Sequence, residues 1–418
     1  MSTTFICDWG GVLMRTVDIR PRLVWEHQLD LTPGELAELL FRGAAWERAQ
    51  RGQATVDDVW TELGRNLKLN EREIAALSRD FWAGDRLDPD LVALIRELRE
   101  LGLRTALLSN HPSNLPGLLS DLGLDDLFDE VIVSALEERT KPDPAIYRLA
   151  LDRLNATPSD AIFADDQRIN VEAARKLGMV AIHFRGARHL RRALATAGVP
   201  LETQPLNPVQ GIRALIFDWG GVLYSLNFIK HTEVWEERLG LTPGALNRVL
   251  WGRKWKQLEI GAISQQEYDD YVAGRLGLGH REAVRQFYQE YYADDRLDQQ
   301  MVAAVRSLRR SYRSAMLTNA FPNHAEESKL HHDFDPRAEF DVYVNSAEVG
   351  LAKPHPAVYR LVLDQLGVAP NEAIFMDDMV RNTDSAEALG IHTLVFTEAE
   401  TGLADLAELL GHPITPEE

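Results

Sequence analysis

The same six residues, Asp-Trp-Gly-Gly-Val-Leu, occur at positions 8–13 and again at positions 218–223. Each copy follows a short apolar run, and such a run predicts a buried strand that would hold Asp8 or Asp218 at its end. The two glycines would let backbone and ligand approach this carboxylate closely. A carboxylate fixed in this way can attack an electrophile such as phosphorus. The repeated string therefore indicates a reactive or ligand-binding site in each copy.

Three further motifs recur in the same order along the chain. They are Ser109-Asn110 with Thr318-Asn319, Lys141-Pro142 with Lys353-Pro354, and Asp165-Asp166 with Asp377-Asp378. The copies lie 209 residues apart for the first of these motifs and 212 for the other two, against 210 for the hexapeptide. A constant order at a nearly constant offset indicates a tandem duplication, and each copy has the size of a normal domain.

The chain is accordingly predicted to form two domains, residues 1–198 and 212–410, joined by a linker over 199–211. The linker carries Pro200, Pro205 and Pro208 and shows little hydrophobic periodicity, which favours an extended tether. A long helical stretch follows the first strand of each copy. It predicts an inserted helical cap over about residues 16–85 in the first domain and about 225–295 in the second.

Beyond each cap, strand and helix signals alternate. In the first copy, apolar runs at 105–108, 131–133, 161–164 and 180–184 are separated by amphipathic stretches such as 145–154. This alternation predicts an α/β fold in which helices cover both faces of a parallel sheet, once in each copy. Ligands of such sheets bind at the carboxyl ends of the strands, and all four motifs fall there.

Composition narrows the class of protein. The chain is 45% hydrophobic and 26% charged, as an ordinary globular protein is, and it contains no apolar run of 18 residues. Its net charge of −19 argues against general nucleic-acid binding, and its single cysteine, Cys7, suits a reducing compartment. We therefore expect a cytoplasmic protein that binds neither membranes nor nucleic acids.

The residue types that converge in each copy define a narrow chemistry. Three carboxylates suit a hard divalent cation such as Mg²⁺, which prefers oxygen ligands. A lysine and a Ser or Thr hydroxyl suit an anionic group bound beside that cation. Cation and lysine would together neutralise charge that spreads over the oxygens of a phosphoryl group during its transfer.

Because its motifs occur in the order Asp, Ser/Thr-Asn, Lys-Pro, Asp-Asp, the chain resembles two copies of a haloacid dehalogenase-like hydrolase. The residues within these motifs resemble those of one branch of the family, the small-molecule phosphatases whose helical cap is inserted after the first motif. The resemblance implies a Rossmann-like core in each copy, bound Mg²⁺ and an aspartyl-phosphate intermediate. It implies nucleophiles at Asp8 and Asp218, catalytic lysines at Lys141 and Lys353, substrate-binding residues at Ser109, Asn110, Thr318 and Asn319, and metal ligands at Asp8, Gly10, Asp165, Asp166, Asp218, Gly220, Asp377 and Asp378, the glycines acting through their carbonyls.

One position departs from the family pattern. Phosphatases that the chain resembles usually carry a second Asp two residues after the nucleophile, where it protonates the leaving group and later activates water. Gly10 and Gly220 occupy this position in the two copies. In the first copy Asp18 and His111 are candidate substitutes, although each also fits a solvated loop residue. The second copy has Asn227 near the place of Asp18.

Three functions stay open at this point. The leading hypothesis is a Mg²⁺-dependent phosphatase of a small phosphorylated metabolite. A weakly catalytic or non-catalytic binding or regulatory protein is the alternative, because both acid/base positions are Gly. A haloacid dehalogenase is the third, and the Asp-Asp pairs disfavour it.

The two caps differ in composition. The second carries Lys254, Lys256, Tyr288, Tyr291 and Tyr292, whereas the first has fewer aromatic residues and no clustered lysines. Since a cap and not the fold decides the substrate, the halves either act on different compounds or one of them has become a structural partner. The duplication also allows the halves to pack as an intramolecular pseudo-dimer.

Overall fold

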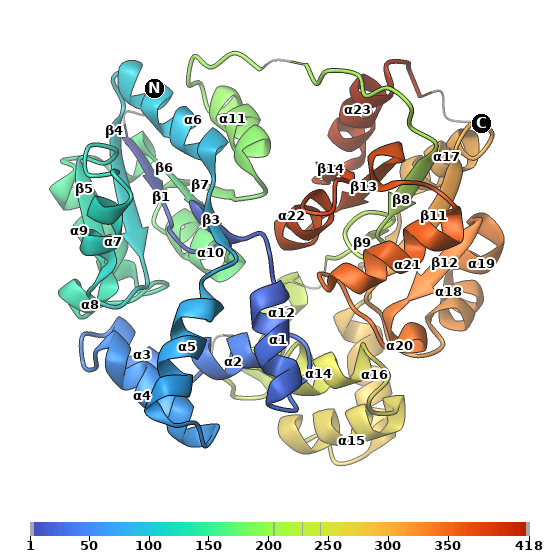
Figure 1. Ribbon diagram of the computed structural model, residues 1–418, viewed down its shortest axis with the longest axis horizontal. Coiled ribbons are helices and arrows are strands. Elements are labelled where there is room, and N and C mark those ends of the chain that lie inside the picture. The colour runs from blue at the N-terminus through green and yellow to red at the C-terminus, as the bar shows by residue number, and fades with distance from the viewer. Residues whose placement is uncertain (1–3, 204, 228, 243, 415–418) are drawn as a thin grey trace. The chain divides into compact units, whose positions relative to one another are not determined.

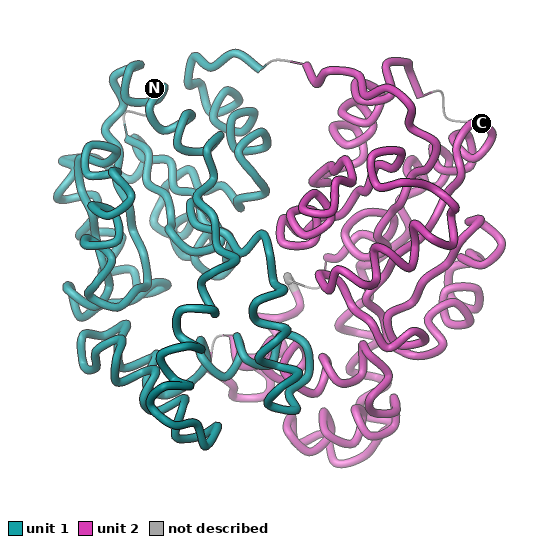
Figure 2. Tube along the Cα trace, viewed as in Figure 1, with its two compact units in different colours: residues 1–204 teal, residues 205–418 magenta. Residues whose placement is uncertain are grey.

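The computed structural model describes residues 4–203, 205–227, 229–242 and 244–414. The chain divides into two compact units, unit 1 over residues 1–204 and unit 2 over residues 205–418 (Figure 2). Each unit has its own sheet and its own hydrophobic cores. The predicted limits of the two domains stay a prediction.

A five-stranded parallel sheet forms the centre of each unit (Figure 1). In unit 1 the order is β5-β4-β1-β6-β7, with β1 (Thr4–Cys7), β4 (Arg104–Ser109), β5 (Glu130–Val133), β6 (Ala161–Asp165) and β7 (Val180–His183). In unit 2 the order is β12-β11-β8-β13-β14, with β8 (Ala214–Phe217), β11 (Arg313–Thr318), β12 (Val342–Asn345), β13 (Ala373–Asp377) and β14 (His392–Val395). The predicted α/β fold with two parallel sheets is confirmed.

Helices cover both faces of each sheet because the central strands bury both. In β1, Phe5 and Cys7 belong to one core cluster and Ile6 to the other, as the alternation of side chains along a strand requires. The first cluster of unit 1 includes residues of α6 (Pro89–Glu100), α7 (Leu115–Asp121) and α11 (Ala187–Thr196), and the second includes residues of α9 (Pro144–Arg153) and α10 (Arg168–Lys176). The corresponding clusters of unit 2 include residues of α17 (Gln299–Leu308), α23 (Ala399–Leu410), α21 (Pro356–Leu366) and α22 (Val380–Glu387).

Short helices complete the connections between strands. They are α8 (Ser134–Glu137) and η1 (Pro158–Asp160) in unit 1, and α18 (His324–His332), α19 (Pro336–Glu339), α20 (Ser346–Val349) and η2 (Pro370–Glu372) in unit 2. The start of α8 and of α20 follows β5 and β12 directly, so the first residue of each helix lies at the carboxyl end of its sheet.

The cap of each unit is a group of helices reached through a two-stranded antiparallel ribbon. In unit 1 the ribbon is β2 (Met14–Thr16) with β3 (Asp85–Leu87), and it encloses α1 (Arg20–Gln28), α2 (Glu35–Phe41), α3 (Ala44–Gln50), α4 (Val56–Asn66) and α5 (Glu71–Phe81). In unit 2 it is β9 (Tyr224–Ser225) with β10 (Arg296–Leu297), and it encloses α12 (Ile229–Arg238), α13 (Ala245–Leu250), α14 (Arg253–Leu258), α15 (Gln265–Leu276) and α16 (Arg281–Tyr291). Each cap has its own apolar core, to which Trp46 and Trp60 of unit 1 belong.

Part of the segment predicted as a linker is packed against the units. Val199 and Leu201 belong to a core cluster of unit 1, whereas Leu206 and Val209 pack against a core cluster of unit 2. Hydrophobic burial therefore anchors this segment on both sides. Across the residues that the structure describes, no helix combines the length and the apolar character needed to cross a membrane.

Candidate functional site

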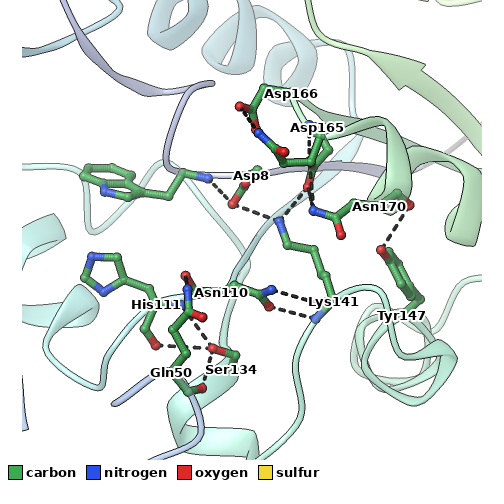
Figure 3. A network of polar contacts seen from close by, with 12 residues as sticks. Asp8, Gln50, Asn110, His111, Ser134, Lys141, Tyr147, Asp165, Asp166 and Asn170 are labelled. Atoms are coloured by element: carbon green, nitrogen blue, oxygen red, sulfur yellow. Dashed lines mark hydrogen bonds and ion pairs between the residues drawn. The ribbon is translucent and has the colours of Figure 1, made fainter. Parts of the chain in front are cut away.

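The site of unit 1 is built around one lysine held between two carboxylates. Lys141 Nζ lies 2.9 Å from Asp8 Oδ1 and 2.6 Å from Asp165 Oδ2 (Figure 3). Asp8 follows β1 and Asp165 ends β6, and because these strands are parallel neighbours their carboxyl ends meet at the same edge of the sheet. All three side chains are buried. The sheet thus brings together motifs that lie far apart in the sequence.

A third carboxylate, Asp166, completes an acidic cluster. Asp8, Asp165 and Asp166 each offer an oxygen within 4.8 Å of the others. Gly11 makes room for Asp166, since a Cβ on Gly11 would lie 2.5 Å from Asp166 Oδ2 and the φ of Gly11 is +77°. The second glycine of the repeated hexapeptide is therefore required both by its backbone conformation and by this close approach.

The backbone of Lys141 is fixed by Asn110, which follows β4. Asn110 Nδ2 donates to the carbonyl of Lys141 at 2.8 Å, and its Oδ1 accepts from the Lys141 N–H at 2.7 Å. The peptide bond from Lys141 to Pro142 is cis. Ser109, the last residue of β4, is 3% exposed at the same edge of the sheet. The predicted substrate-binding pair thus lies beside Lys141, the residue predicted to be the catalytic lysine of unit 1.

An asparagine that the sequence analysis missed and a tyrosine that recurs in register with the Lys-Pro motif support this cluster. Asn170 Nδ2 donates to both oxygens of Asp165, at 3.0 and 3.1 Å, and Tyr147 donates to the carbonyl of Asn170 at 3.0 Å. Asn382 and Tyr359 make the same contacts in unit 2. The signal was present in the sequence, because an Asn follows the Asp-Asp motif at the same spacing in both copies.

The cluster of unit 1 holds more carboxylates than cations, and it is buried. Burial alone would lower the pKa of Lys141, but the two carboxylates beside it raise that pKa above its ordinary value. Burial also raises the pKa of Asp165 and of Asp166, with the neighbouring carboxylates adding to the rise. One ammonium thus faces three carboxylates. An all-oxygen donor set with this excess of negative charge fits a hard divalent cation.

Unit 2 repeats the contacts of the lysine with the carboxylates, whereas the hydrogen bond from Gln167 to Asp166 has no counterpart because Met379 stands at that position. Lys353 Nζ lies 2.6 Å from Asp218 Oδ1 and 2.7 Å from Asp377 Oδ2, and Asp378 completes the carboxylate cluster. Asn319 clamps the backbone of Lys353 with two hydrogen bonds of 2.8 Å. Thr318, at the end of β11, is 2% exposed. Burial raises the pKa of Asp218 well above its usual range.

The two candidate substitutes for the absent acid have partners of their own. Asp18 accepts hydrogen bonds from the Arg20 guanidinium at 2.7 and 2.8 Å, and these bonds lower its pKa. His111 places Nδ1 2.9 Å from the carbonyl of Pro112, and burial lowers its pKa. A Cβ added to Gly10 would meet no heavy atom of the described residues within 4 Å, and the φ of Gly10 is not in the left-handed region. A Cβ therefore fits at this position, and neither unit has a side chain there.

The cap residues singled out in unit 2 have different roles. Lys256 forms an ion pair with Glu259 at 2.8 Å within the cap itself. Tyr291 belongs to the core of the cap, and Tyr288 and Tyr292 pack against that core. Most of the cap aromatic residues therefore hold the cap together.

Comparison with known proteins places both halves in one family. Residues 3–178 and 212–390 each match the haloacid dehalogenase-like hydrolases. The chain is 34% identical over 190 residues to sesquiterpene phosphatase astK of Aspergillus oryzae, a match that covers 44% of this chain and 92% of that protein. It is 31% identical over 212 residues to acyl-CoA dehydrogenase family member 10 of Mus musculus, a match that covers 48% of this chain but 19% of that protein.

A solved structure gives a further match. It is a HAD family enzyme of Bacteroides thetaiotaomicron in complex with magnesium and inorganic phosphate, 24% identical, with 44% of this chain and 93% of that chain covered and a TM-score of 0.39. The family match over both halves confirms the tandem duplication that the repeated motifs predict. The chain therefore belongs to the haloacid dehalogenase-like hydrolases and carries two copies of their fold in tandem.

Proposed function

We propose that each unit is a Mg²⁺-dependent phosphatase that hydrolyses a small phosphorylated metabolite through an aspartyl-phosphate intermediate. The observation that carries this proposal is the contact of Lys141 Nζ with Asp8 Oδ1, 2.9 Å, and with Asp165 Oδ2, 2.6 Å. This contact puts a fixed positive charge beside the carboxylate that would attack phosphorus. Unit 2 has the same contact through Lys353.

In the first step, one carboxylate oxygen of Asp8 or Asp218 forms a bond to phosphorus. The bond from phosphorus to the leaving-group oxygen breaks, and its electron pair stays on that oxygen, which takes a proton from solvent. The lysine offsets the charge on the phosphoryl oxygens, and the hydroxyl of Ser109 or Thr318 donates a hydrogen bond to one of them.

Each acidic cluster would hold one Mg²⁺ ion, in unit 1 through Asp8, Asp165 and Asp166. When bound, the ion neutralises negative charge where the carboxylates and the phosphoryl group meet. Asn170 keeps Asp165 oriented for this role by donating to both of its oxygens. Gly11 keeps Asp166 within reach of the nucleophile because it has no side chain.

In the second step, water attacks the phosphorus of the aspartyl-phosphate, phosphate leaves, and the carboxylate is restored. This water loses a proton, and Gly10 and Gly220 offer no base at the position where the family usually has one. General acid–base help is typically worth about 10²–10⁴-fold in rate. We therefore expect the second step to limit turnover, with a burst of leaving group before it.

A phosphate ester is favoured over a carbon–halogen substrate on two grounds. The three-carboxylate clusters fit a cation, which the dehalogenase reaction of this superfamily does not need. The relative from Aspergillus oryzae is also named as a phosphatase of a sesquiterpene. The caps, which lie beside the strand ends, would select the organic group beyond the phosphate.

The test measures phosphate release by the full chain from a panel of sugar phosphates, nucleotides and small phospho-acids, with and without Mg²⁺. We expect Mg²⁺-dependent release that is lost in the Asp8→Asn, Asp218→Asn double variant. Full turnover in that double variant would overturn the nucleophile assignment. Halide release that a chelator does not inhibit would favour the dehalogenase instead.

The glycines at the acid/base positions favour a second candidate, a weakly catalytic binding or regulatory protein. Asp18 is held as a carboxylate by Arg20, so it is a poor proton donor. A trapped phospho-enzyme that does not turn over on the panel would favour this second function. Steady turnover without a burst would favour the first and would show that another group transfers the proton.

A further inference from the structure

The cap of unit 1 makes a direct hydrogen bond to the loop that holds the catalytic lysine. Gln50, the last residue of α3, donates from Nε2 to the carbonyl of Asn110 at 2.9 Å (Figure 3). Asn110 is the residue whose side chain clamps the backbone of Lys141. Three residues thus connect the cap to the ammonium that contacts Asp8.

A second hydrogen bond fixes the backbone of Gln50. Ser134, the first residue of α8, donates from Oγ to the carbonyl of Gln50 at 2.7 Å and accepts from the N–H of His111 at 3.0 Å. The loop after β4 and the first residue of α8 therefore hold the same cap residue. Trp46 of α3 adds an edge-on contact to the ring of His111, with centroids 6.3 Å apart.

The chain approaches α8 closely just after Gln50, and unit 2 repeats this approach at α20. A Cβ on Gly52 would lie 2.4 Å from the carbonyl of Ala135, and one on Gly261 would lie 2.4 Å from the carbonyl of Ala347. Both glycines have a positive φ. This shared contact shows that position 50 of unit 1 corresponds to position 259 of unit 2, two residues before the glycine in each case.

Unit 2 has a different residue at this position. Glu259 is 4% exposed, and its Oε1 forms an ion pair with Lys256 at 2.8 Å inside the cap. An ionised carboxylate has no hydrogen to donate, so Glu259 cannot make the bond that Gln50 makes to a carbonyl. Ser346, the counterpart of Ser134, accepts from the N–H of Ala320 at 3.1 Å.

We propose that Gln50 is a positioning residue that holds the cap of unit 1 closed on the phosphate-binding loop, and that unit 2 has exchanged this bond for the Lys256–Glu259 pair. The proposal rests on the proposed phosphatase function only for its kinetic consequence. In unit 1, cap closure is coupled through Asn110 to the loop after β4. In unit 2, the cap closes without that coupling.

The kinetic test uses the full chain with Asp218→Asn, so that turnover reports unit 1 alone. Gln50→Leu removes the donor and shortens the side chain by one atom, and Gln53→Leu makes the same change on the exposed face of the cap as a matched control. A hydrogen bond of this kind is worth about a 2- to 10-fold change in an equilibrium. We expect Gln50→Leu to raise KM by about that factor with kcat unchanged or higher, and Gln53→Leu to change neither.

A charge variant sharpens the result. Gln50→Glu places a carboxylate against the carbonyl of Asn110, and we expect a larger rise in KM than for Gln50→Leu. Adding Glu47→Lys recreates the pair of unit 2 at the same i, i+3 spacing. We expect this double variant to lower KM again toward the value for Gln50→Leu, because the carboxylate then has a partner.

A second readout does not depend on catalysis. Hydrogen exchange of the full chain, with Mg²⁺ and inorganic phosphate as the only probes, reports protection of the segments around 44–52 and 109–111. We expect Gln50→Leu to lower protection in both segments and Gln53→Leu to leave both unchanged. This result would stand even if the chain hydrolysed no phosphate ester, so it separates the failure of this proposal from the failure of the proposed function.

Two outcomes would overturn the proposal. One is unchanged exchange in both segments with unchanged KM. The other is a fall in kcat at constant KM together with a lower melting temperature, which would mean that Gln50 only stabilises the fold. The reciprocal change in unit 2 is Lys256→Glu with Glu259→Gln, made in an Asp8→Asn chain. We expect it to lower the KM of unit 2, because the glutamine introduced at position 259 could then make the bond that Gln50 makes in unit 1. A higher KM would count against the proposal.

Discussion

The lysine–carboxylate contacts at the strand ends are the same in the two units, whereas the caps differ in the residue that faces the core. Lys141 and Lys353 each contact two carboxylates at 2.6–2.9 Å, and the Asn–Tyr pair behind them recurs. Where the cap meets the core, unit 1 has Gln50 and unit 2 has Glu259. On the proposed function, the chemistry at the strand ends would tolerate little change in geometry, while the cap surface that would meet the organic part of a substrate could change freely.

The surroundings of Asp8 and Asp218, the proposed nucleophiles, differ as well. In unit 2 the residue after Asp218, Trp219, meets the ring of His324 edge-on at 5.0 Å. The position of His324 in unit 1 is Leu115, which is fully buried in the core. The position of His111 in unit 2 is Ala320. We therefore expect the two units to share a reaction and to differ in substrate.

The largest effect should come from the nucleophiles. Asp8→Asn should abolish turnover of the substrates of unit 1, by at least about 10³-fold, because the attacking oxygen loses its charge. Asp218→Asn should do the same for unit 2 only. Substrate profiles of the two single variants, measured against the same panel, check this. If either variant lost all activities at once, the units would not be independent catalysts.

A restored acid should give the next largest effect. Gly10→Asp adds a carboxylate where a Cβ meets nothing within 4 Å, and the φ of Gly10 lies outside the left-handed region that favours glycine. We expect the slow phase after the burst to quicken toward the roughly 10²-fold lower bound of acid–base help. Rapid-quench kinetics of the full chain with an aryl phosphate measure both phases.

Gly11→Asp is the matched control for that variant. The φ of Gly11 is +77°, and a Cβ there would lie 2.5 Å from Asp166 Oδ2. We expect it to damage the site and to quicken nothing. Linear product release without a burst in the unaltered chain would contradict the basis of this prediction, and His111 would be the next residue to change.

Much of the core could be predicted from sequence because a parallel sheet brings strand ends together. The motifs at Asp8, Asn110, Lys141 and Asp165 follow four strands or loops at one edge, so the fold alone makes them neighbours. The close approach of Asp166 requires a glycine at Gly11, and not at Gly10, where related phosphatases usually carry the acid. Sequence order alone could not tell which of the two glycines had the positive φ.

The hydrogen bond between the cap and the core of unit 1 could not be predicted from the sequence. The bond from Gln50 to Asn110 joins side chain and backbone across 60 residues, and nothing in the local pattern distinguishes Gln50 from other polar cap residues. Asp18 looked like a spare acid because only its distance from Asp8 along the chain was visible. Its bidentate contact with Arg20 depends on the backbone at the start of the cap.

Metal binding should give an effect of intermediate size, and it compares the two clusters directly. Saturating Mg²⁺ at about 100 times its Kd would stabilise a unit by about 2.7 kcal/mol. We expect Asp166→Ala to remove this gain from unit 1 only and Asp378→Ala from unit 2 only. Thermal unfolding with and without Mg²⁺, followed by segment-resolved hydrogen exchange, assigns the loss. Stabilisation that both variants retain would place the ion elsewhere.

The smallest effect concerns acid stability and a residue that only unit 2 has. His324 is 4% exposed, and its Nδ1 lies 3.0 Å from the hydroxyl of Tyr343. Burial, helped by His332 and Arg337, lowers its pKa to about 4. Its Nε2 is buried and has no hydrogen-bond partner among the described residues, so a proton there would be costly.

The sign of the pH effect follows from proton binding in the two states. The unfolded chain protonates this imidazole near its ordinary pKa of about 6.5, whereas the folded unit does so only near pH 4. The unfolded state therefore binds more protons between these values, and the stability of unit 2 falls as the pH falls through that window. The contribution amounts to about 2 kcal/mol between pH 7 and pH 5.

His324→Leu, which installs the residue of unit 1, should remove this contribution. At pH 7 the variant should be slightly less stable than the natural chain, because the hydrogen bond to Tyr343 is lost. At pH 5 the order should reverse, since the variant has no imidazole to protonate on unfolding. Pulse proteolysis in urea at the two pH values measures the difference, with fragments of unit 1 as the internal reference. Parallel loss of stability in both chains would mean that His324 is already protonated in folded unit 2 at pH 5.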